Sequence, residues 1–325
     1  MPDWVEKFTD AQAEKLEKKI KKVYSDAAID VRRKIDSFLD VHKVKAARKY
    51  QQLQAGEITK AEYESWMKGQ VFQGERWKAK LKEITNSYVH ADERAREMLG
   101  GIQKDVFLES ANRTAYEMWR DGRNIVGGID FDIYDRKTVD KLIKGNPKML
   151  PEWKINEKKD YIWNESRVQN AITQGIIQGE SVSDVGRRLV VDLSASNAAK
   201  MDMFARTALN GAQNAGRIER MHEAEEMGIE VKKQWLATLD NRTRDTHREL
   251  DGQEAAVDEP FKIDGMMIDF PGDPSADPAL TYNCRCTLKY VYPKYRHMQN
   301  TERRDQKNDK NIPFMTYKEW KAGGQ

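Results

Sequence analysis

The sequence predicts an α+β fold, with long helices toward the N-terminus and a small antiparallel sheet toward the C-terminus. Three observations indicate this class. Between Asp3 and Ala55 there is neither Gly nor Pro, and apolar residues recur at helical spacing. Charged residues make up 34% of the 325 residues, which suits solvated helices around a thin core better than a compact enzyme. From Glu230 onward, strand-forming and turn-forming residues replace the helical pattern.

The first helix is predicted to fill the stretch before Gly56. Apolar or small residues advance in steps of three and four, which places them on one helix face. They are Leu16, Ile20, Val23, Ala27, Val31, Ile35 and Phe38. A helix of about 40 residues would be about 60 Å long, so partner helices must cover this stripe.

Further helices are predicted after Gly56. Thr59-Lys-Ala-Glu62 has the pattern of a capping box. Gly69, Gly74 and the pair Gly100-Gly101 are expected to separate the following segments. One of those segments carries a second helical stripe, formed by Trp77, Leu81, Ile84 and Tyr88.

Residues 127–160 are predicted to connect two helical blocks. Gly and Pro are frequent there, and Ile129-Asp-Phe131-Asp-Ile133 alternates as a short strand would. Beyond this connector, helices are expected from Tyr161 to Gln178, from Val182 to Val191 after a Ser181 cap, and from Ala198 to Met227.

A strand is predicted from Val231 to Leu239, and a short helix should follow it. Asp240 can cap that helix through its carboxylate, and Gly252 can end it. Arg244, His247 and Asp251 are three and four residues apart, so they would share one helix face.

The segment Asn283-Cys284-Arg285-Cys286 is expected to lie against this short helix. On a strand, both thiols would point to one side and Arg285 to the other. A small domain with a Pro271-Gly-Asp-Pro274 turn between the two segments must fold one back onto the other to bury anything. We therefore expect both thiols to face His247.

Charge, hydropathy and cysteine content argue against several classes of protein. The formal net charge is only +3, whereas a general polyanion-binding protein would be more basic. The sequence has neither about 18 consecutive apolar residues nor the apolar segment of a signal peptide. Its two cysteines cannot form a disulfide framework. We expect a protein made and kept in a reducing cytoplasm, with no membrane contact during assembly.

An ordered series of motifs carries a resemblance. It runs from Phe204-Ala-Arg206-Thr207 through Asn214 and Gly216 to the Asp-x-Arg-Thr-Arg-x-x-His element and its Leu-Asp-Gly, then through Pro-Gly-Asp-Pro to Asn-Cys-Arg-Cys. Its main residues are Arg206, Thr207, Asp240, Arg242, Thr243, Arg244, His247, Gly252, Asn283, Cys284, Arg285 and Cys286. In this order the motifs resemble the phage Mu F-like head-morphogenesis family, the minor head proteins of tailed phages.

The sequence as a whole predicts four segments. Residues 1–126 would form a long-helix domain, residues 127–160 the connector, residues 161–295 the Mu F-like domain, and residues 296–325 a basic tail whose Trp320 docks on a neighbour. The resemblance implies a structural component of the virion, present in few copies inside the head near the portal vertex and made in the host cytoplasm. The expected partners are the portal protein, scaffolding or major capsid protein, and packaged DNA, with roles in DNA packaging and ejection.

A zinc site is one chemical interpretation of the motif residues. His247, Cys284 and Cys286 are soft ligands, and Asp240 or Asp251 could complete a tetrahedron. Against it, Cys-x-Cys is a tight bite, and structural zinc usually uses two well-separated ligand pairs. Because no fourth ligand is evident, we favour a reduced, metal-free cluster and expect no cofactor.

Two enzymatic interpretations stay open beside the structural one. Cys284 with His247 and an aspartate would form the nucleophile site of a cysteine hydrolase. Arg242, Arg244, His247 and Asp240 would form a metal-independent nuclease site. The same residues can instead hold a small domain together through Arg–Asp bonds. The resemblance brings no established catalytic residue, and the stretch after the cysteines is too short for the toxin that some relatives carry, so we expect no enzyme.

A DNA-binding module is the third interpretation. Lys43, Lys45, Arg48 and Lys49 are four positive residues without a negative one between positions 41 and 50, and they could follow DNA phosphates. Aromatic residues that could stack on bases hardly occur among them. One charged face of a long helix explains the same pattern and is favoured.

Overall fold

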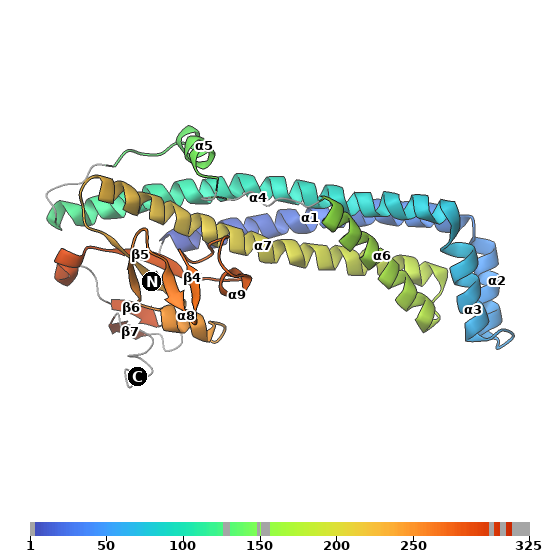
Figure 1. Cartoon of the computed structure of the whole chain (residues 1–325). Helices are drawn as coiled ribbons and strands as arrows, with labels where there is room; N and C mark the ends of the chain where they lie inside the picture. Colours follow the sequence, from blue (N-terminus) through green and yellow to red (C-terminus); the bar gives the residue numbers. More distant parts are fainter. Residues whose placement is uncertain are drawn as a thin grey trace. The chain divides into compact units, whose positions relative to one another are not determined.

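The computed structural model describes residues 4–125, 131–147, 150, 157–298, 302–305 and 310–313. It confirms the α+β class: long helices precede small antiparallel sheets (Figure 1). The helices are α1 (Trp4–Asp40), α2 (Lys43–Gln54), α3 (Lys60–Trp66) with a π-helical turn (Met67–Val71), α4 (Gly74–Ile125), α5 (Arg136–Gly145), α6 (Glu157–Gln178), α7 (Val182–Glu226), α8 (Asp245–Leu250) and α9 (Pro278–Thr281). The strands are β1 (Lys232–Leu236), β2 (Glu254–Ala256), β3 (Phe261–Ile263), β4 (Met266–Ile268), β5 (Thr287–Val291), β6 (Glu302–Asp305) and β7 (Lys310–Pro313), with a 3-10 segment at Pro293–Met298.

The chain forms two compact units, each assembled from separate stretches of sequence. The first unit contains Met1–Leu16, Leu99–Glu152 and Met203–Gln325, and the second contains Glu17–Met98 and Trp153–Asp202. The four continuous segments expected from the sequence stay a prediction. The predicted docking of Trp320 lies outside the described residues.

The predicted apolar stripe of the first helix is confirmed, because all seven of its residues are buried. The helix does not continue to Gly56, however: α1 ends at Asp40 and α2 begins at Lys43. The buried stripe stops at Leu39, and Val41 beyond it is 57% exposed. Without packing on one face, a long helix gains little from continuing.

The start of α3 is as predicted. The backbone N–H of Glu62 donates to Thr59 Oγ1 over 3.2 Å, and the N–H of Thr59 donates back to Glu62 Oε2 over 2.7 Å. The expected break at Gly100-Gly101 is wrong, since α4 runs through both glycines. A helical glycine costs only about 1 kcal/mol, and buried Leu99 and Val106 on either side hold the helix by packing.

The strand expected at Ile129–Ile133 is absent from the described part of it, residues 131–133. The side chain of Asn112 on α4 takes the place of a partner strand: it donates to Tyr134 O and accepts from Tyr134 N, both over 2.9 Å. Asp135 then caps α5 by accepting from Thr138 N over 2.8 Å. The local polar bonds therefore end the extended segment and start a helix.

The second helical block follows the prediction with one difference. Helix α6 matches the expected Tyr161–Gln178 helix, and Ser181 accepts from Asp184 N over 3.2 Å at the start of α7. The two helices expected after Ser181 are one continuous α7. No helix among the described residues has the length and hydropathy that a membrane crossing requires.

The main sheet of the first unit is antiparallel, in the order β2-β1-β5. Strand β1 confirms the strand expected at Val231–Leu239, and its register pairs Trp235 with Leu288 of β5. Trp235 is fully buried and meets the Phe261 ring edge-on at 5.3 Å. This core holds the loops that carry the motif residues.

Candidate functional site

The α7 motifs contact the C-terminal motifs directly, within the first unit. Thr207 Oγ1 accepts from the backbone N–H of Asn283 over 3.1 Å, and Asn283 itself has a φ of +54°. Phe204 meets the ring of Tyr282 edge-on at 5.7 Å. Arg206 is exposed, and its positive charge opposes the rise that burial causes in the pKa of Asp10.

Asn214 connects α7 to two further segments. Its amide donates to Pro271 O over 2.9 Å and to Cys286 O over 3.3 Å, and its Oδ1 accepts from Leu288 N over 3.0 Å. The side chain is fully buried. One amide thus joins α7, the Pro-Gly-Asp-Pro turn and the start of β5.

Two glycines of α7 allow backbone to approach closely. A Cβ on Gly211 would lie 2.5 Å from the carbonyl oxygen of Gly272, and one on Gly216 would lie 2.6 Å from that of Phe107. Gly272 also has a φ of +82°, which residues with a Cβ rarely adopt. Sequence reasoning named Gly216 and the turn but missed Gly211, because a small residue on a helix face has no signal of its own.

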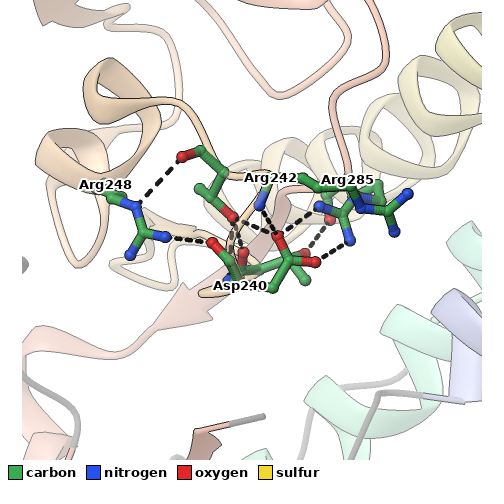
Figure 2. Close-up of polar contacts among 6 residues, drawn as sticks. Asp240, Arg242, Arg248 and Arg285 are labelled. Carbon is green, nitrogen blue, oxygen red and sulfur yellow. Dashed lines mark hydrogen bonds and ion pairs between the residues drawn. The ribbon is translucent and has the colours of Figure 1, made fainter. Parts of the chain in front are cut away.

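The loop after β1 is built around Asp240. Its carboxylate accepts from the backbone N–H of Arg242 over 2.8 Å and from both terminal nitrogens of Arg285, one of them at 2.8 Å. Arg248 reaches its carbonyl oxygen from the other side (Figure 2). Arg285 holds the pKa of the Asp240 carboxyl well below its ordinary value.

Thr243 and Arg244 extend these bonds. Thr243 donates to Thr238 O, and Arg244 donates to Tyr282 O on the segment before β5. We call Asp240, Thr243, Arg244, Arg248 and Arg285 the Asp240 clasp. Its side chains meet the backbone and one another, so it ties the loop to the segment before β5.

Two local expectations for this loop are wrong. Asp240 does not cap α8, because it closes a turn onto Arg242 and the helix starts only at Asp245. Asp251 does not share a helix face with Arg244, because α8 ends at Leu250 and the Asp251 carboxylate accepts from Ala237 N over 2.8 Å. Gly252 follows with a φ of +77°, as a helix stop requires.

His247, Cys284 and Cys286 form the thiol-imidazole cluster. The Nδ1 atom of His247 lies 3.6 Å from Cys284 Sγ and 3.3 Å from Cys286 Sγ. All three residues are at most 4% exposed. The fold-back prediction is therefore confirmed, although residues 284–286 precede β5 and do not themselves form a strand.

The two thiols have opposite pKa shifts. Burial raises the pKa of Cys286 well above its ordinary value. Burial also raises that of Cys284, but hydrogen bonds from Cys286 and the charges of Arg244 and Arg285 lower its pKa overall. Cys284 is thus the thiol more easily ionised, yet it is enclosed in the core.

The contacts of this site favour a structural role over a catalytic one. His247 is 2% exposed, and the guanidinium groups of Arg244 and Arg248 donate hydrogen bonds to backbone carbonyls. A nuclease or hydrolase needs such groups open to a substrate.

The candidate DNA contacts belong to the second unit. Lys45 and Arg48 are exposed on α2, and Lys49 is half-buried, with its charge near Glu62. The side chain of Lys43 lies outside the described residues.

Fold and site define a class of protein: a mainly helical chain whose small C-terminal sheet is joined to α7 by the buried side chain of Asn214 and to the loop after β1 by the Asp240 clasp. Residues 166–289 match the family described as Phage Mu protein F like protein. The chain is also 30% identical over 228 residues to the minor head protein GP7 of Bacillus phage SPP1, covering 69% of this chain and 70% of GP7. The chain belongs to the phage Mu F-like family, and these matches support a phage head protein.

Two other similarities are partial. The chain is 36% identical over 158 residues to a protein of Enterococcus faecalis named NAD(+)--arginine ADP-ribosyltransferase EFV, covering 48% of this chain and 31% of that protein. It is 26% identical over 167 residues to the uncharacterized protein YqbB of Bacillus subtilis, covering 51% of YqbB. This chain therefore spans less than a third of the transferase. No solved structure is significantly similar to it.

Proposed function

We propose that this protein is a low-copy structural component of a tailed-phage head that joins the shell at the portal vertex. The observation that carries the proposal is the similarity to a minor head protein over 70% of that protein's length. The portal protein is the principal partner, with scaffolding or major capsid protein beside it. The site supports a structural role, because Arg244, Arg248 and Arg285 donate hydrogen bonds to other groups of the same site.

Packaged DNA is a further partner in this proposal. Lys45 and Arg48 are exposed on α2 and are free of acidic neighbours in the sequence between positions 41 and 50. Such residues can neutralise phosphates. A protein placed where DNA enters the head can assist packaging and ejection through contacts of this kind.

The enzymatic alternative has one supporting similarity, the transferase-named protein, of which this chain spans 31%. That span does not place a catalytic group here, and the three residues of the thiol-imidazole cluster are at most 4% exposed. The structural role is therefore preferred.

The experiment is a count of copies in purified heads. Quantitative gel or mass-spectrometric analysis should find far fewer copies of this chain than of the major capsid protein. Procapsids assembled without portal protein should lack it. Copy numbers in proportion to the major capsid protein, or incorporation into procapsids that lack portal protein, would contradict the vertex assignment.

A further inference from the structure

We propose that His247, Cys284 and Cys286 bind a single zinc ion, with water or another small exogenous ligand in the fourth position. The three potential ligand atoms lie within 4.8 Å of one another. They come from two segments, α8 and the residues before β5, which are separated by most of the small sheet domain. Convergence of three soft ligands from two segments is the observation to explain.

The two nitrogen–sulfur distances fit a tetrahedral site. With zinc–sulfur bonds of about 2.3 Å and zinc–nitrogen bonds of about 2.0 Å, neighbouring ligand atoms lie about 3.5 Å apart. The Nδ1 atom of His247 is 3.3 Å from one sulfur and 3.6 Å from the other. Both separations therefore leave room for one ion at a bonding distance from each ligand.

A hydrogen bond to the imidazole accounts for only one of its two sulfur neighbours. An imidazole nitrogen has either one hydrogen or one lone pair, so Nδ1 can make a good hydrogen bond to one sulfur at a time. Both sulfurs nevertheless lie within 3.6 Å of it, and all three residues are buried. A cation in the centre satisfies both sulfurs and the nitrogen together.

The surroundings suit a thiolate site. The backbone N–H of Cys286 donates to Cys284 Sγ over 3.4 Å, and bonds of this kind stabilise a metal-bound sulfur. Asp240 and Asp251, the carboxylates considered for the fourth ligand, are held instead by Arg285 and by the backbone of Ala237. The fourth position is therefore left to an exogenous ligand, as in zinc sites with three protein ligands.

The ion would fasten the C-terminal domain. It would link α8 to the start of β5 and so close the intervening loop of the chain. Ligands that are apart in the unfolded chain come together only in the folded one, so metal binding stabilises folding. This use needs no access for a substrate, which agrees with the burial of the cluster.

Metal content of the full-length, untagged protein tests the proposal. Protein produced with zinc in the medium should carry about one zinc ion per chain. Replacement by cobalt should produce a thiolate-to-cobalt charge-transfer band and the intense visible bands of tetrahedral cobalt. A wild-type protein with less than about a tenth of an ion per chain and no charge-transfer band would overturn the proposal and leave a metal-free thiol cluster.

Variants separate metal binding from general stability. Cys286→Ser and His247→Gln should each weaken zinc affinity by about tenfold or more. Asp240→Asn is the matched control, because it weakens the neighbouring clasp without removing a ligand, and it should keep its zinc. A chelator should lower the melting temperature of the wild type by several degrees and that of Cys286→Ser hardly at all. Equal zinc loss in all three variants would contradict the assignment.

Discussion

Single residues of the Asp240 clasp act through fixed geometry. Arg285 meets both oxygens of Asp240, and Arg248 meets the carbonyl of the same residue. Bidentate bonds between a guanidinium and a carboxylate are directional as well as strong. Each clasp residue therefore fixes part of the loop, and replacing it should lower the free energy of unfolding.

The Asp240–Arg285 pair should make stability depend on pH. The pKa of Asp240 is lower in the folded chain than in the unfolded one. The pair therefore stabilises the protein above the unfolded-state pKa of about 4, and this contribution is lost as the pH falls toward the folded-state value. Asp240→Asn should cost about 1 kcal/mol at pH 7, since the pair is partly exposed.

Urea unfolding across the pH range checks this expectation. The difference between wild type and Asp240→Asn should shrink steadily below about pH 5. A double-mutant cycle with Arg285→Met supplies the control, because it isolates the interaction between the two side chains. If the stability difference between the two proteins stays constant down to pH 3, the Asp240–Arg285 pair is not its cause.

Arg244→Ala should reduce stability and head incorporation together. It removes the bond to Tyr282 O that ties the loop to the segment before β5. Losing a charged hydrogen bond costs about 1.5–3 kcal/mol, so the melting temperature should fall by several degrees. Thermal denaturation and gel analysis of heads measure the two effects.

Arg242→Ala is the matched control for that variant. Arg242 lies in the same loop, but its side chain is exposed. We expect a change of less than about 0.5 kcal/mol and normal incorporation. If Arg244→Ala kept full stability but abolished hydrolysis of DNA, RNA or a peptide by the protein, the enzymatic interpretation would replace the structural one.

At the scale of elements, α7 positions the site by letting neighbouring backbone come close. Gly211 touches Gly272 of the Pro-Gly-Asp-Pro turn, and Gly216 touches α4 at Phe107. Asn214 lies between them and supplies the bonds to the turn and to β5. The helix is thus both a packing surface and a source of polar contacts.

Gly211→Ala should be strongly destabilising. The new methyl group would lie 2.5 Å from a carbonyl oxygen, and neither backbone can give way without disturbing the turn. We expect a loss of about 2 kcal/mol or more in the free energy of unfolding. Gly100→Ala in α4 is the control: nothing lies within 4 Å of its new methyl group, so it should be neutral or stabilise by about 0.5–1 kcal/mol. Equal effects of the two changes would contradict the close-approach argument.

At the scale of the whole molecule, positive and negative charges nearly balance, with a formal net charge of +3. Any binding to DNA must therefore come from local groups of like charge. The α2 residues Lys45 and Arg48 form such a group, since both are exposed. The proposed contact with packaged DNA depends on them.

Replacing Lys45 and Arg48 by alanine should weaken duplex binding and its salt dependence. Two phosphate contacts fewer should reduce the slope of log K against log salt by about two. Titration of duplex DNA at several salt concentrations measures that slope. The control replaces Lys18 and Lys22, two exposed residues of α1, and should leave the slope unchanged. Equal losses in both double variants would show that the change in net charge, and not the position of the α2 residues, weakens DNA binding.

The sequence by itself determined the buried face of the first helix, the first strand of the main sheet and the family. A period of three to four residues reports which face is buried, so the stripe from Leu16 to Phe38 was predictable. The capping box at Thr59 is equally local. The fold-back of Cys284 and Cys286 onto His247 also followed, because a small domain has few ways to bury two distant segments.

Only the tertiary structure decided where the helices end and how the site is joined. Helix α4 passes through Gly100-Gly101 because packing outweighs a propensity cost of about 1 kcal/mol per glycine. The segment before α5 is not a strand because Asn112, far away in sequence, takes its hydrogen bonds. Gly211 matters only because Gly272 lies against it. Local pattern specifies which residues are buried, whereas contacts between distant segments depend on three-dimensional geometry that no local pattern contains.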